Sequence, residues 1–576
     1  MTELKRGQLL LSSTGTGKTF IAGALVRRLK DKDFAKNKSF GHVQYLYVTR
    51  ATIVEQTERV FANYFGLTIR DGVEILNIEQ LRSRAGAVWI KEEVVIVQGK
   101  EQTIYKWRPM MNPVVILWDE CQALKNEDSI QHQIALAFSE LQCETYQVFI
   151  SATPFTRVSE AKCFAVATRK DISVILGMPI GTKLSPATWP TYASAMSQDS
   201  KPEDYNEAAV ERLVKDLDNY IIRVRGVRPQ FDAINSINMI EFESKEDCLF
   251  YEAAWDRYLR EKAKLEKDAG EGGVAGFMIL VQFLKFRMAA ELCRAPYLAR
   301  RMFQGTKDGY ASVAALNFKG SIIKVVMELE KLGVARDKIS LVWGGGQTAL
   351  TKKQRTALDI KEKADALIKI GMSLEEVMKS LDITEDDLLE AESRAEMMEN
   401  IPAHLQLGAQ SKEERQREID RFQSGRSLYC LYTFRAGGVG LSLHHSDELT
   451  KIKCRRKKSG YVVIEDIPLI SVRPRINFVA PTYSAMELVQ GLGRCPRLTS
   501  LSNTKQELIF YRGTIEDSVA RIVSHKLKCL SKVVRMRESW QDVCVGGGAS
   551  VVEDHINNTN NDMDNPDDVH DGEDDV

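Results

Sequence analysis

The sequence predicts an α/β protein in which helices cover parallel β-sheets. Short apolar runs alternate with amphipathic helical patterns, as over residues 41–57 and 73–81, and strands that alternate with helices form parallel sheets. The apolar run at residues 114–118 is continuous, which is typical of a central strand covered on both faces. A chain of 576 residues is long enough for two or more domains, each with its own core.

The N-terminal region has the strand, turn and helix pattern of a phosphate-binding loop. The apolar run Leu9–Leu11 is followed by a glycine-containing turn and an amphipathic helix. Gly15 and Gly17 allow backbone N–H groups to converge on phosphates, Lys18 supplies a positive charge, and the Thr19 hydroxyl can bind Mg²⁺. The alternative is a Gly/Thr turn before an amphipathic helix. We predict a nucleoside triphosphate site formed by Ser13, Thr14, Gly15, Thr16, Gly17, Lys18 and Thr19.

Two carboxylates follow the predicted central strand. Ligands bind at the carboxyl ends of such strands, so Asp119 is placed to bind Mg²⁺ and Glu120 to orient the water that attacks the γ-phosphate. An exposed acidic turn is the alternative interpretation of an isolated Asp-Glu pair. The phosphate loop upstream, in the same alternating pattern, favours the catalytic interpretation.

The periodicity continues along the chain and predicts further elements. We expect a small hairpin over residues 93–107, a helix over 216–228 and a strand over 235–242, followed by helices over 249–267 and 277–302. A second α/β unit begins near residue 318, with a helix over 321–332, a strand over 339–346, a helix over 415–422 and a strand over 427–431.

Three segments of the first α/β unit resemble motifs I, II and III of superfamily 2 helicases and translocases. They are Ser-Thr-Gly-Thr-Gly-Lys-Thr at 13–19, Asp-Glu-Cys-Gln at 119–122 and Ser-Ala-Thr-Pro at 151–154. The Leu-Lys-Asn at 124–126 is similar to the Swi/Snf-like branch, where a histidine typically stands at the position of Gln122 and helps to couple hydrolysis to the nucleic acid. The resemblance also implies a motif Ia that presents Arg50 and Gln56 to the nucleic acid, although Arg50 equally fits a solvated loop.

Two later segments complete the resemblance: residues 432–443 resemble motif V, and residues 490–497 resemble motif VI. Two arginines three residues apart on a helix face the same way and can both reach a γ-phosphate. The resemblance therefore implies catalytic roles for Gln490, Arg494 and Arg497, nucleotide contact by Gly440, and nucleic-acid contact by Thr433, Arg435, Gly437 and Gly438.

Motifs in this order imply two RecA-like lobes with ATP bound between them. We expect lobe 1 over residues 1–160, a linker and mainly helical region over 161–317, and lobe 2 over 318–535.

Lobe 2 is expected to contain two insertions. The segment 347–410 has the rhythm of a helix-turn-helix, but its third helix is acidic, so we expect it to contact a protein partner rather than DNA. The segment 450–460 is basic, with six Lys/Arg within 451–458, among them Lys457, which suggests a hairpin that grips phosphates. A nuclear-import signal and a solvated turn are the alternatives for it.

The charge composition supports a polyanionic partner. The chain has 79 basic and 79 acidic residues, but residues 553–576 hold ten Asp/Glu and no Lys/Arg, which leaves 79 against 69 and a net charge of +10 for the rest. The composition of residues 536–576 predicts a disordered acidic tail. Ten scattered cysteines without paired spacing predict reduced thiols and no zinc site. No apolar run reaches the roughly 18 residues of a membrane span, so we expect a soluble, intracellular protein.

These features together predict an ATP-dependent translocase or helicase that uses Mg²⁺ and moves on nucleic acid, with DNA favoured over RNA. An RNA helicase of the same superfamily and a scaffold without turnover remain the alternatives. Residues 481–485 also resemble the Swi/Snf-like helicases of large DNA viruses. The family usually has an adenine-recognition segment upstream of motif I, and only seven residues precede Gln8, so base selectivity is open, and whether an N-terminal part is missing is open as well.

Overall fold

The computed structural model describes residues 5–12, 17–37, 43–51, 53–82, 89–97, 100–108, 114–141, 145–198, 200–224, 230–268, 274–343, 410–434, 441–446, 450–456, 462–467, 473–497 and 499–535. Contacts between residues divide the chain into two compact units. One consists of Met1–Ala290, Val439–Ser446 and Pro474–Val576, and the other of Glu291–Gly438 and Asp447–Arg473. Among the residues described, no helix is long and apolar enough to cross a lipid bilayer.

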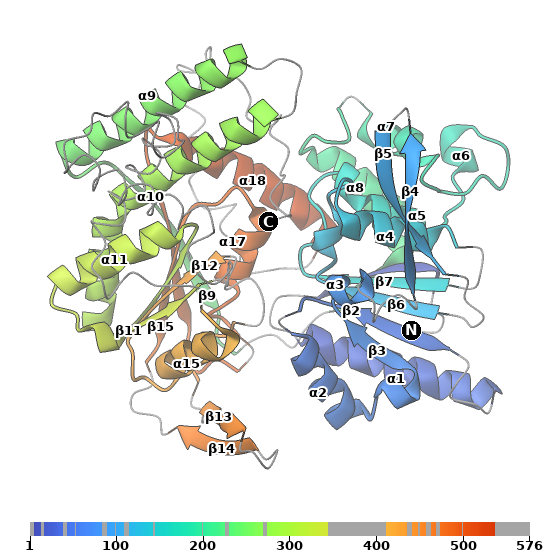
Figure 1. The fold of residues 1–576 in the computed structure, drawn as a ribbon, viewed down its shortest axis with the longest axis horizontal. Coiled ribbons are helices and arrows are strands. Elements are labelled where there is room, and N and C mark those ends of the chain that lie inside the picture. Colours follow the sequence, from blue (N-terminus) through green and yellow to red (C-terminus); the bar gives the residue numbers. More distant parts are fainter. Residues whose placement is uncertain are drawn as a thin grey trace, which may run out of the picture. The chain divides into compact units, whose positions relative to one another are not determined.

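The first sheet consists of six strands in the order β3-β2-β6-β7-β1-β8 (Figure 1). All neighbouring pairs are parallel, which confirms the predicted α/β class and is the strand arrangement of a RecA-like lobe. The strands are β1 (Gly7–Ser12), β2 (Gln44–Val48), β3 (Val73–Leu76), β6 (Val114–Asp119), β7 (Thr145–Ser151) and β8 (Ile221–Val224).

Helices cover both faces of this sheet. On β1, Leu9 and Leu11 belong to one buried apolar cluster and Leu10 to another, because successive side chains of a strand point to opposite faces. The Leu10 face is covered by α1 (Lys18–Asn37) and α2 (Val54–Phe65). The opposite face packs against α4 (Ile130–Ser139), α5 (Lys162–Ala167), α7 (Trp189–Ser197) and α8 (Glu207–Asp216). Short helices α3 (Ile78–Arg82) and α6 (Ser173–Leu176) complete this part.

The second sheet also has six strands, in the order β11-β12-β10-β15-β16-β9. Its strands are β9 (Ala233–Ile240), β10 (Ala311–Leu316), β11 (Ile339–Val342), β12 (Tyr429–Thr433), β15 (Arg475–Val479) and β16 (Thr504–Tyr511). Its helices are α11 (Lys319–Lys331), α15 (Lys412–Gln423), α17 (Ala485–Leu492) and α18 (Ile515–Val534). Thr514 caps α18, since its side chain accepts a hydrogen bond from the Glu516 N–H.

The region between the two predicted lobes supplies an edge strand to each sheet. The expected helix over 216–228 is wrong: Ile221–Val224 forms β8, which pairs with β1 in parallel. This short segment contains β-branched residues, which favour a strand, and its backbone pairs with the edge of β1. Local periodicity does not reveal a pairing between segments so far apart in the chain. The expected strand near 235–242 is confirmed as β9, which pairs with β16.

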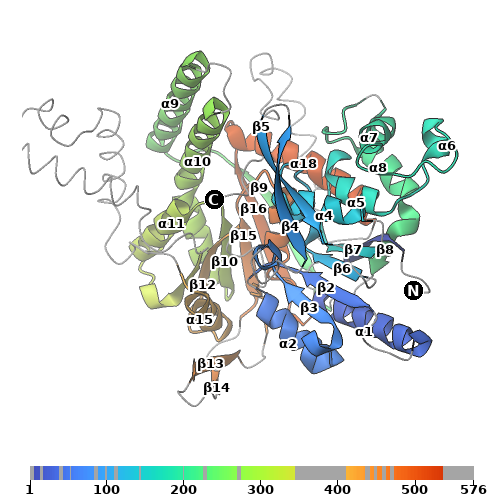
Figure 2. The ribbon, with the colours of Figure 1, turned by 45° about the vertical axis from the view of Figure 1, so that its right-hand side comes forward.

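Two long helices follow β9, as predicted. They are α9 (Lys245–Asp268) and α10 (Val274–Lys307), and they lie side by side in Figures 1 and 2. Aromatic side chains join them: the Tyr258 ring stacks on Phe286 at a centroid distance of 5.8 Å, and Trp255 lies 4.9 Å from the same ring.

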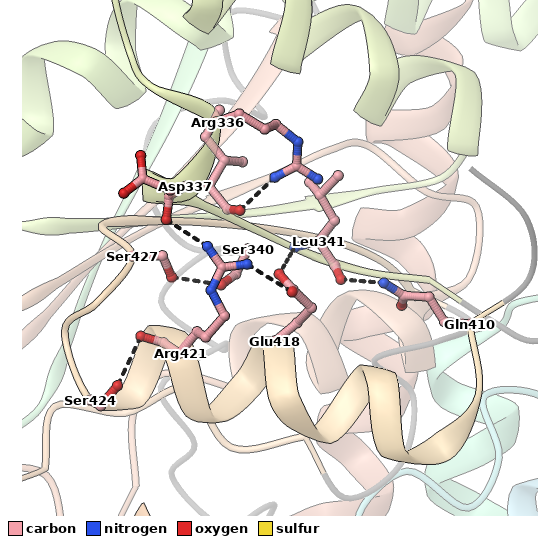
Figure 3. A network of polar contacts seen from close by, with 10 residues as sticks. Arg336, Asp337, Ser340, Leu341, Gln410, Glu418, Arg421, Ser424 and Ser427 are labelled. Atoms are coloured by element: carbon pink, nitrogen blue, oxygen red, sulfur yellow. Dashed lines mark hydrogen bonds and ion pairs between the residues drawn. The ribbon is translucent and has the colours of Figure 1, made fainter. Parts of the chain in front are cut away.

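Side chains satisfy the backbone of β11, the outermost strand on one edge of the second sheet (Figure 3). Glu418 of α15 accepts a hydrogen bond from the Leu341 N–H at 3.1 Å, and Gln410 donates to the Leu341 carbonyl at 2.8 Å. Gln410 also accepts from the Trp343 N–H at 3.1 Å. The predicted insertion 347–410 therefore ends at Gln410 beside this edge, and its other residues lie outside the described part of the chain.

Two antiparallel hairpins accompany the sheets. The hairpin predicted near 93–107 is confirmed as β4 (Ile90–Val97) and β5 (Lys100–Trp107). The basic insertion contains β13 (Thr450–Arg456), which pairs with β14 (Val462–Ile467). Lys457 and the predicted acidic tail fall outside the described part of the chain.

Candidate active site

Lys18 is the first residue of α1, the helix that comes next after β1 along the chain. Gly17 has φ +78°, a left-handed backbone conformation that side chains disfavour, so the turn into the helix requires glycine. The helix N-terminus at this position is a favourable place for an anion, because its first N–H groups have no partner within the helix. Thr19 follows on the first turn. The predicted contacts of Ser13, Thr14, Gly15 and Thr16 lie outside the described residues.

Glu120 faces this helix terminus from the carboxyl end of β6. Its Oε1 lies 3.3 Å from Lys18 Nζ, and both side chains are largely buried, at 16% and 14% exposure. Glu120 has a left-handed backbone with φ 51°, which is unusual for a residue other than glycine. Such strain persists where the surrounding structure requires a particular side-chain direction, and it occurs often at functional sites.

The neighbouring carboxylate of Asp119 is held by two hydrogen bonds. The Thr49 hydroxyl, at the end of β2, donates to Asp119 Oδ2 at 2.9 Å, and the Glu120 N–H donates to Oδ1 at 3.1 Å. Burial and the charge of Glu120 raise the pKa of Asp119 to about 6. Burial acts in the same direction on Glu120, but the Lys18 ammonium and the Gln122 amide outweigh it and hold the pKa of Glu120 below its usual value.

Gln122 connects the acidic pair with the end of β7. Its Nε2 donates to Glu120 Oε2 at 2.6 Å, and its Oε1 accepts a hydrogen bond from the Ser151 hydroxyl at 2.6 Å. The Ser151 hydroxyl oxygen in turn accepts from the Thr153 N–H at 2.8 Å. Gln122 is only 4% exposed. The segments that resemble motifs II and III are thus joined through one buried amide.

The arrangement suits Mg²⁺ better than a transition metal. Asp119 and Thr19 offer oxygen ligands, and Mg²⁺ binds proteins through one or two carboxylates and retains several waters. The buried Tyr47 hydroxyl lies beside this pair, and burial, followed by the charge of Asp119, raises the pKa of Tyr47 above its usual value. Among the described residues, no group of three or more His, Cys, Asp or Glu could hold a metal ion.

The predicted nucleic-acid residues of lobe 1 are exposed. Arg50 follows Thr49, and its charge contributes to the low pKa of Glu120. Gln56 is exposed on the first turn of α2.

The predicted arginine fingers lie just after α17. Arg494 and Arg497 both donate to the Leu441 carbonyl, at 3.4 and 3.0 Å, and the Arg494 carbonyl accepts from the Leu443 N–H. Gln490 is partly buried on α17. The segments resembling motifs V and VI are therefore in contact through 441–443. Thr433 is buried at the end of β12, whereas Arg435, Gly437, Gly438 and Gly440 fall outside the described residues.

Sequence reasoning missed two buried residues beside these arginines. Arg475 is 1% exposed and donates to the Leu443 carbonyl at 3.0 Å. His444 has Ser442 Oγ 2.8 Å from its Nδ1 and Thr499 Oγ1 3.0 Å from its Nε2. Burial, Arg497 and Arg475 lower the pKa of His444 to about 4, so its imidazole is neutral near pH 7. Neither residue lies in a segment that resembles a motif. Their positions in the sequence, close to the segments that resemble motifs V and VI, were the signal available.

The first α/β unit is similar to a known protein family. Residues 2–156 match the family described as "Type III restriction enzyme, res subunit". Lys18, Asp119 and Gln122 all lie within this matched range. The match supports a domain similar to the ATPase domain of superfamily 2 helicases.

Part of the chain is also similar to a viral protein. An Acanthamoeba polyphaga mimivirus protein, named as a "Putative ATP-dependent RNA helicase", is 28% identical over 127 residues, which make up 22% of this chain and 19% of the mimivirus protein. The chain thus matches about a fifth of the length of this curated relative. Two solved structures of S. cerevisiae Dbp5 bound to RNA and ADP BeF3, one of them of a variant, match at 10% identity and a TM-score of 0.36. They cover 95% of this chain and 89% of Dbp5.

Proposed function

We propose that this chain is a nucleic-acid-dependent ATPase that couples ATP hydrolysis to movement along DNA. The observation that carries the proposal is the continuous buried contact from Lys18 through Glu120 and Gln122 to Ser151. It links a phosphate-binding lysine to a carboxylate base, and the base to the segment that resembles motif III.

Each residue of the cluster has a role in this proposal. Lys18 binds the phosphates, and Thr19 and Asp119 hold Mg²⁺, which neutralises phosphate charge when bound. Glu120 accepts a proton from the attacking water, and its low pKa keeps it ionised for this task. Arg494 and Arg497, with Gln490 beside them, stabilise the charge that develops on the γ-phosphate. Ser13 to Thr16 and Gly440 complete the nucleotide contacts.

Coupling requires that the hydrolytic site respond to the polymer. In this proposal Arg50, Gln56, Thr433, Arg435, Gly437, Gly438 and Lys457 contact the nucleic acid, and Gln122 transmits the state of the site. A glutamine can do so because its amide donates to Glu120 while its carbonyl oxygen accepts from Ser151, so a shift of either partner moves the other. The insertion 347–410 is proposed to bind a protein partner.

An RNA helicase is the second candidate, because the mimivirus relative is named as an RNA helicase. The Leu-Lys-Asn of 124–126 and the Arg-Ala-Gly-Gly of 435–438 favour DNA through their likeness to Swi/Snf-type enzymes. A scaffold without turnover is disfavoured, because Lys18, Glu120 and both arginines are present.

The test is steady-state phosphate release with no polymer, duplex DNA, single-stranded DNA or RNA, each at two salt concentrations. Stimulation by DNA that weakens with salt is expected, since phosphate contacts release counterions. Stimulation by RNA alone would select the second candidate, and no turnover with any polymer would contradict both.

A further inference from the structure

Helix α18 packs against elements of both sheets. Cys529 and Val533, in its C-terminal half, are fully buried in the apolar cluster that covers one face of the first sheet, and the helix lies beside α8 there. It also contacts β16 of the second sheet. All of these residues belong to one of the two compact units. A side chain near the middle of α18 can therefore contact residues attached to either sheet.

Lys526, near the middle of α18, makes two such contacts with one atom. Its Nζ donates a hydrogen bond to the Tyr483 carbonyl at 3.0 Å, and it lies over the Tyr205 ring, 4.7 Å from the ring centre. An ammonium close to the face of an aromatic ring is attracted by the negative charge of that face. The Lys526 side chain is half-buried, so both contacts are partly shielded from water.

The Tyr205 ring is attached to the first sheet. It packs against the buried apolar cluster of that sheet and directly precedes Asn206, the N-cap of α8. The Arg157 guanidinium lies over the same ring, 5.1 Å from its centre. Arg157 comes three residues after the Ser-Ala-Thr-Pro segment, and its Nε lies 3.3 Å from Glu160 Oε1. The ring therefore contacts one cation beside the segment that resembles motif III and one cation on α18.

Tyr483 lies at the start of α17, the helix that precedes the two predicted arginine fingers. It directly precedes Ser484, the N-cap of this helix. The other end of α17 is held by the second sheet, since Gln506 of β16 donates to the Leu492 carbonyl at 2.5 Å. The contact with Lys526 therefore holds the start of the helix, and the sheet holds its end.

We propose that Lys526 is a positioning residue, which fixes the start of α17, and with it Arg494 and Arg497, relative to Tyr205 on the first sheet. The lysine takes no part in the chemistry itself. Catalytic groups act efficiently only when they are held in the productive geometry by surrounding contacts, and Lys526 supplies one such contact. This inference rests on the proposed function, in which the two arginines stabilise charge on the γ-phosphate.

The inference predicts a loss of kcat in Lys526→Met, which removes the charge and the donor but keeps most of the apolar stem. A misplacement of about 1 Å can lower a rate about a hundredfold, so we expect kcat to fall about tenfold to a hundredfold. KM for ATP should stay within about twofold, because Lys18 and Asp119 are unaffected. Lys526→Arg keeps a cation over the ring and a donor, so it should keep kcat within about threefold.

A second effect does not depend on turnover. The Leu488 N–H bonds to the Ser484 carbonyl at 3.0 Å in the first turn of α17. When the contact with Tyr483 is lost, this turn opens more often, so the Leu488 amide should exchange its hydrogen about tenfold faster in Lys526→Met than in the native chain. In Lys526→Arg the exchange should be native.

The experiment measures amide hydrogen exchange and polymer-stimulated phosphate release for the full chain, Lys526→Met, Lys526→Arg and Lys532→Met. Lys532 is the matched control, because it also lies on α18 and holds this helix to α8, with its Nζ 3.2 Å from Glu211 Oε2. Lys532→Met should change neither kcat nor the exchange of α17. An equal effect of Lys532→Met would overturn the inference, since it would show that any loosening of α18 has the same result.

Two further results would overturn the inference: native kcat in Lys526→Met, or a fall in kcat with native exchange of α17, which would locate the effect elsewhere. If the native chain releases no phosphate with any polymer, the proposed function fails. The exchange measurement still tests the inference in that case, because native exchange of Leu488 in Lys526→Met overturns it.

Discussion

Replacement of Gln122 by alanine tests the connection between the acidic pair and the end of β7. The substitution removes two buried hydrogen bonds of 2.6 Å, one to the Glu120 carboxylate and one from the Ser151 hydroxyl. A bond to a charged group contributes about 1.5–3 kcal/mol and one between neutral groups about 0.5–1.5 kcal/mol. We therefore expect the free energy of unfolding to fall by about 2–4 kcal/mol.

The same variant should separate hydrolysis from its stimulation. Lys18 and Glu120 contact each other directly at 3.3 Å, and this contact does not involve Gln122, so ATP turnover without polymer should persist within severalfold. The response to DNA should be lost, because no side chain then links Glu120 to Ser151. The assays are urea unfolding and phosphate release with and without duplex DNA, in a range of DNA concentrations that establishes saturation.

Gln133→Ala is the matched control, because the Gln133 amide is exposed and makes only a long contact of 3.4 Å with the Asp128 carbonyl. It should change neither stability nor stimulation. Native DNA stimulation in Gln122→Ala would refute the assigned role of Gln122, even if stability falls as expected.

Three further predictions address the site. Glu120→Gln removes the proposed base, so it should keep nucleotide affinity and lower turnover by at least about a hundredfold. Calorimetry measures the affinity and phosphate release measures the turnover. Native turnover would exclude Glu120 as the base. Arg497→Ala should lower kcat by about a thousandfold with little change in nucleotide affinity, whereas a change in affinity alone would indicate a binding residue. His444 has a folded pKa of about 4, below its unfolded value near 6.5, so its contribution to stability is complete above pH 6.5 and is lost as the pH falls toward 4. At pH 5 this loss is about 2 kcal/mol, and His444→Gln should flatten the fall in urea-derived stability between pH 7.5 and 5 by that amount; an unchanged slope would contradict it.

Local patterns predicted the elements whose structure depends on their own residues. The continuous apolar run before Asp119 became the central strand β6, and the predicted hairpin near 93–107 became β4 and β5. The strand β8 was predicted as a helix, because its conformation depends on pairing with β1, far away in the chain. Tertiary pairing of this kind leaves no periodic trace in a short segment.

The candidate site was predictable as a set of residues but not as a set of contacts. Glycine, lysine and carboxylate positions follow from the chemistry that phosphate and Mg²⁺ require. The left-handed backbone of Glu120 and the two bonds of Gln122 depend on how β6 and β7 end side by side, which the residue types do not specify. Tyr47 looked like an ordinary strand residue, and only its register beside Thr49 gives it a place near Asp119.

Movement on DNA is the central claim, and displacement of a third strand from a DNA triplex measures it directly. The full chain with Mg²⁺ and ATP should release the third strand, while Glu120→Gln, or the native chain with a non-hydrolysable analogue, should not. Hydrolysis that DNA stimulates without strand displacement would contradict coupling to movement, and equal displacement by Glu120→Gln would show that hydrolysis does not drive it.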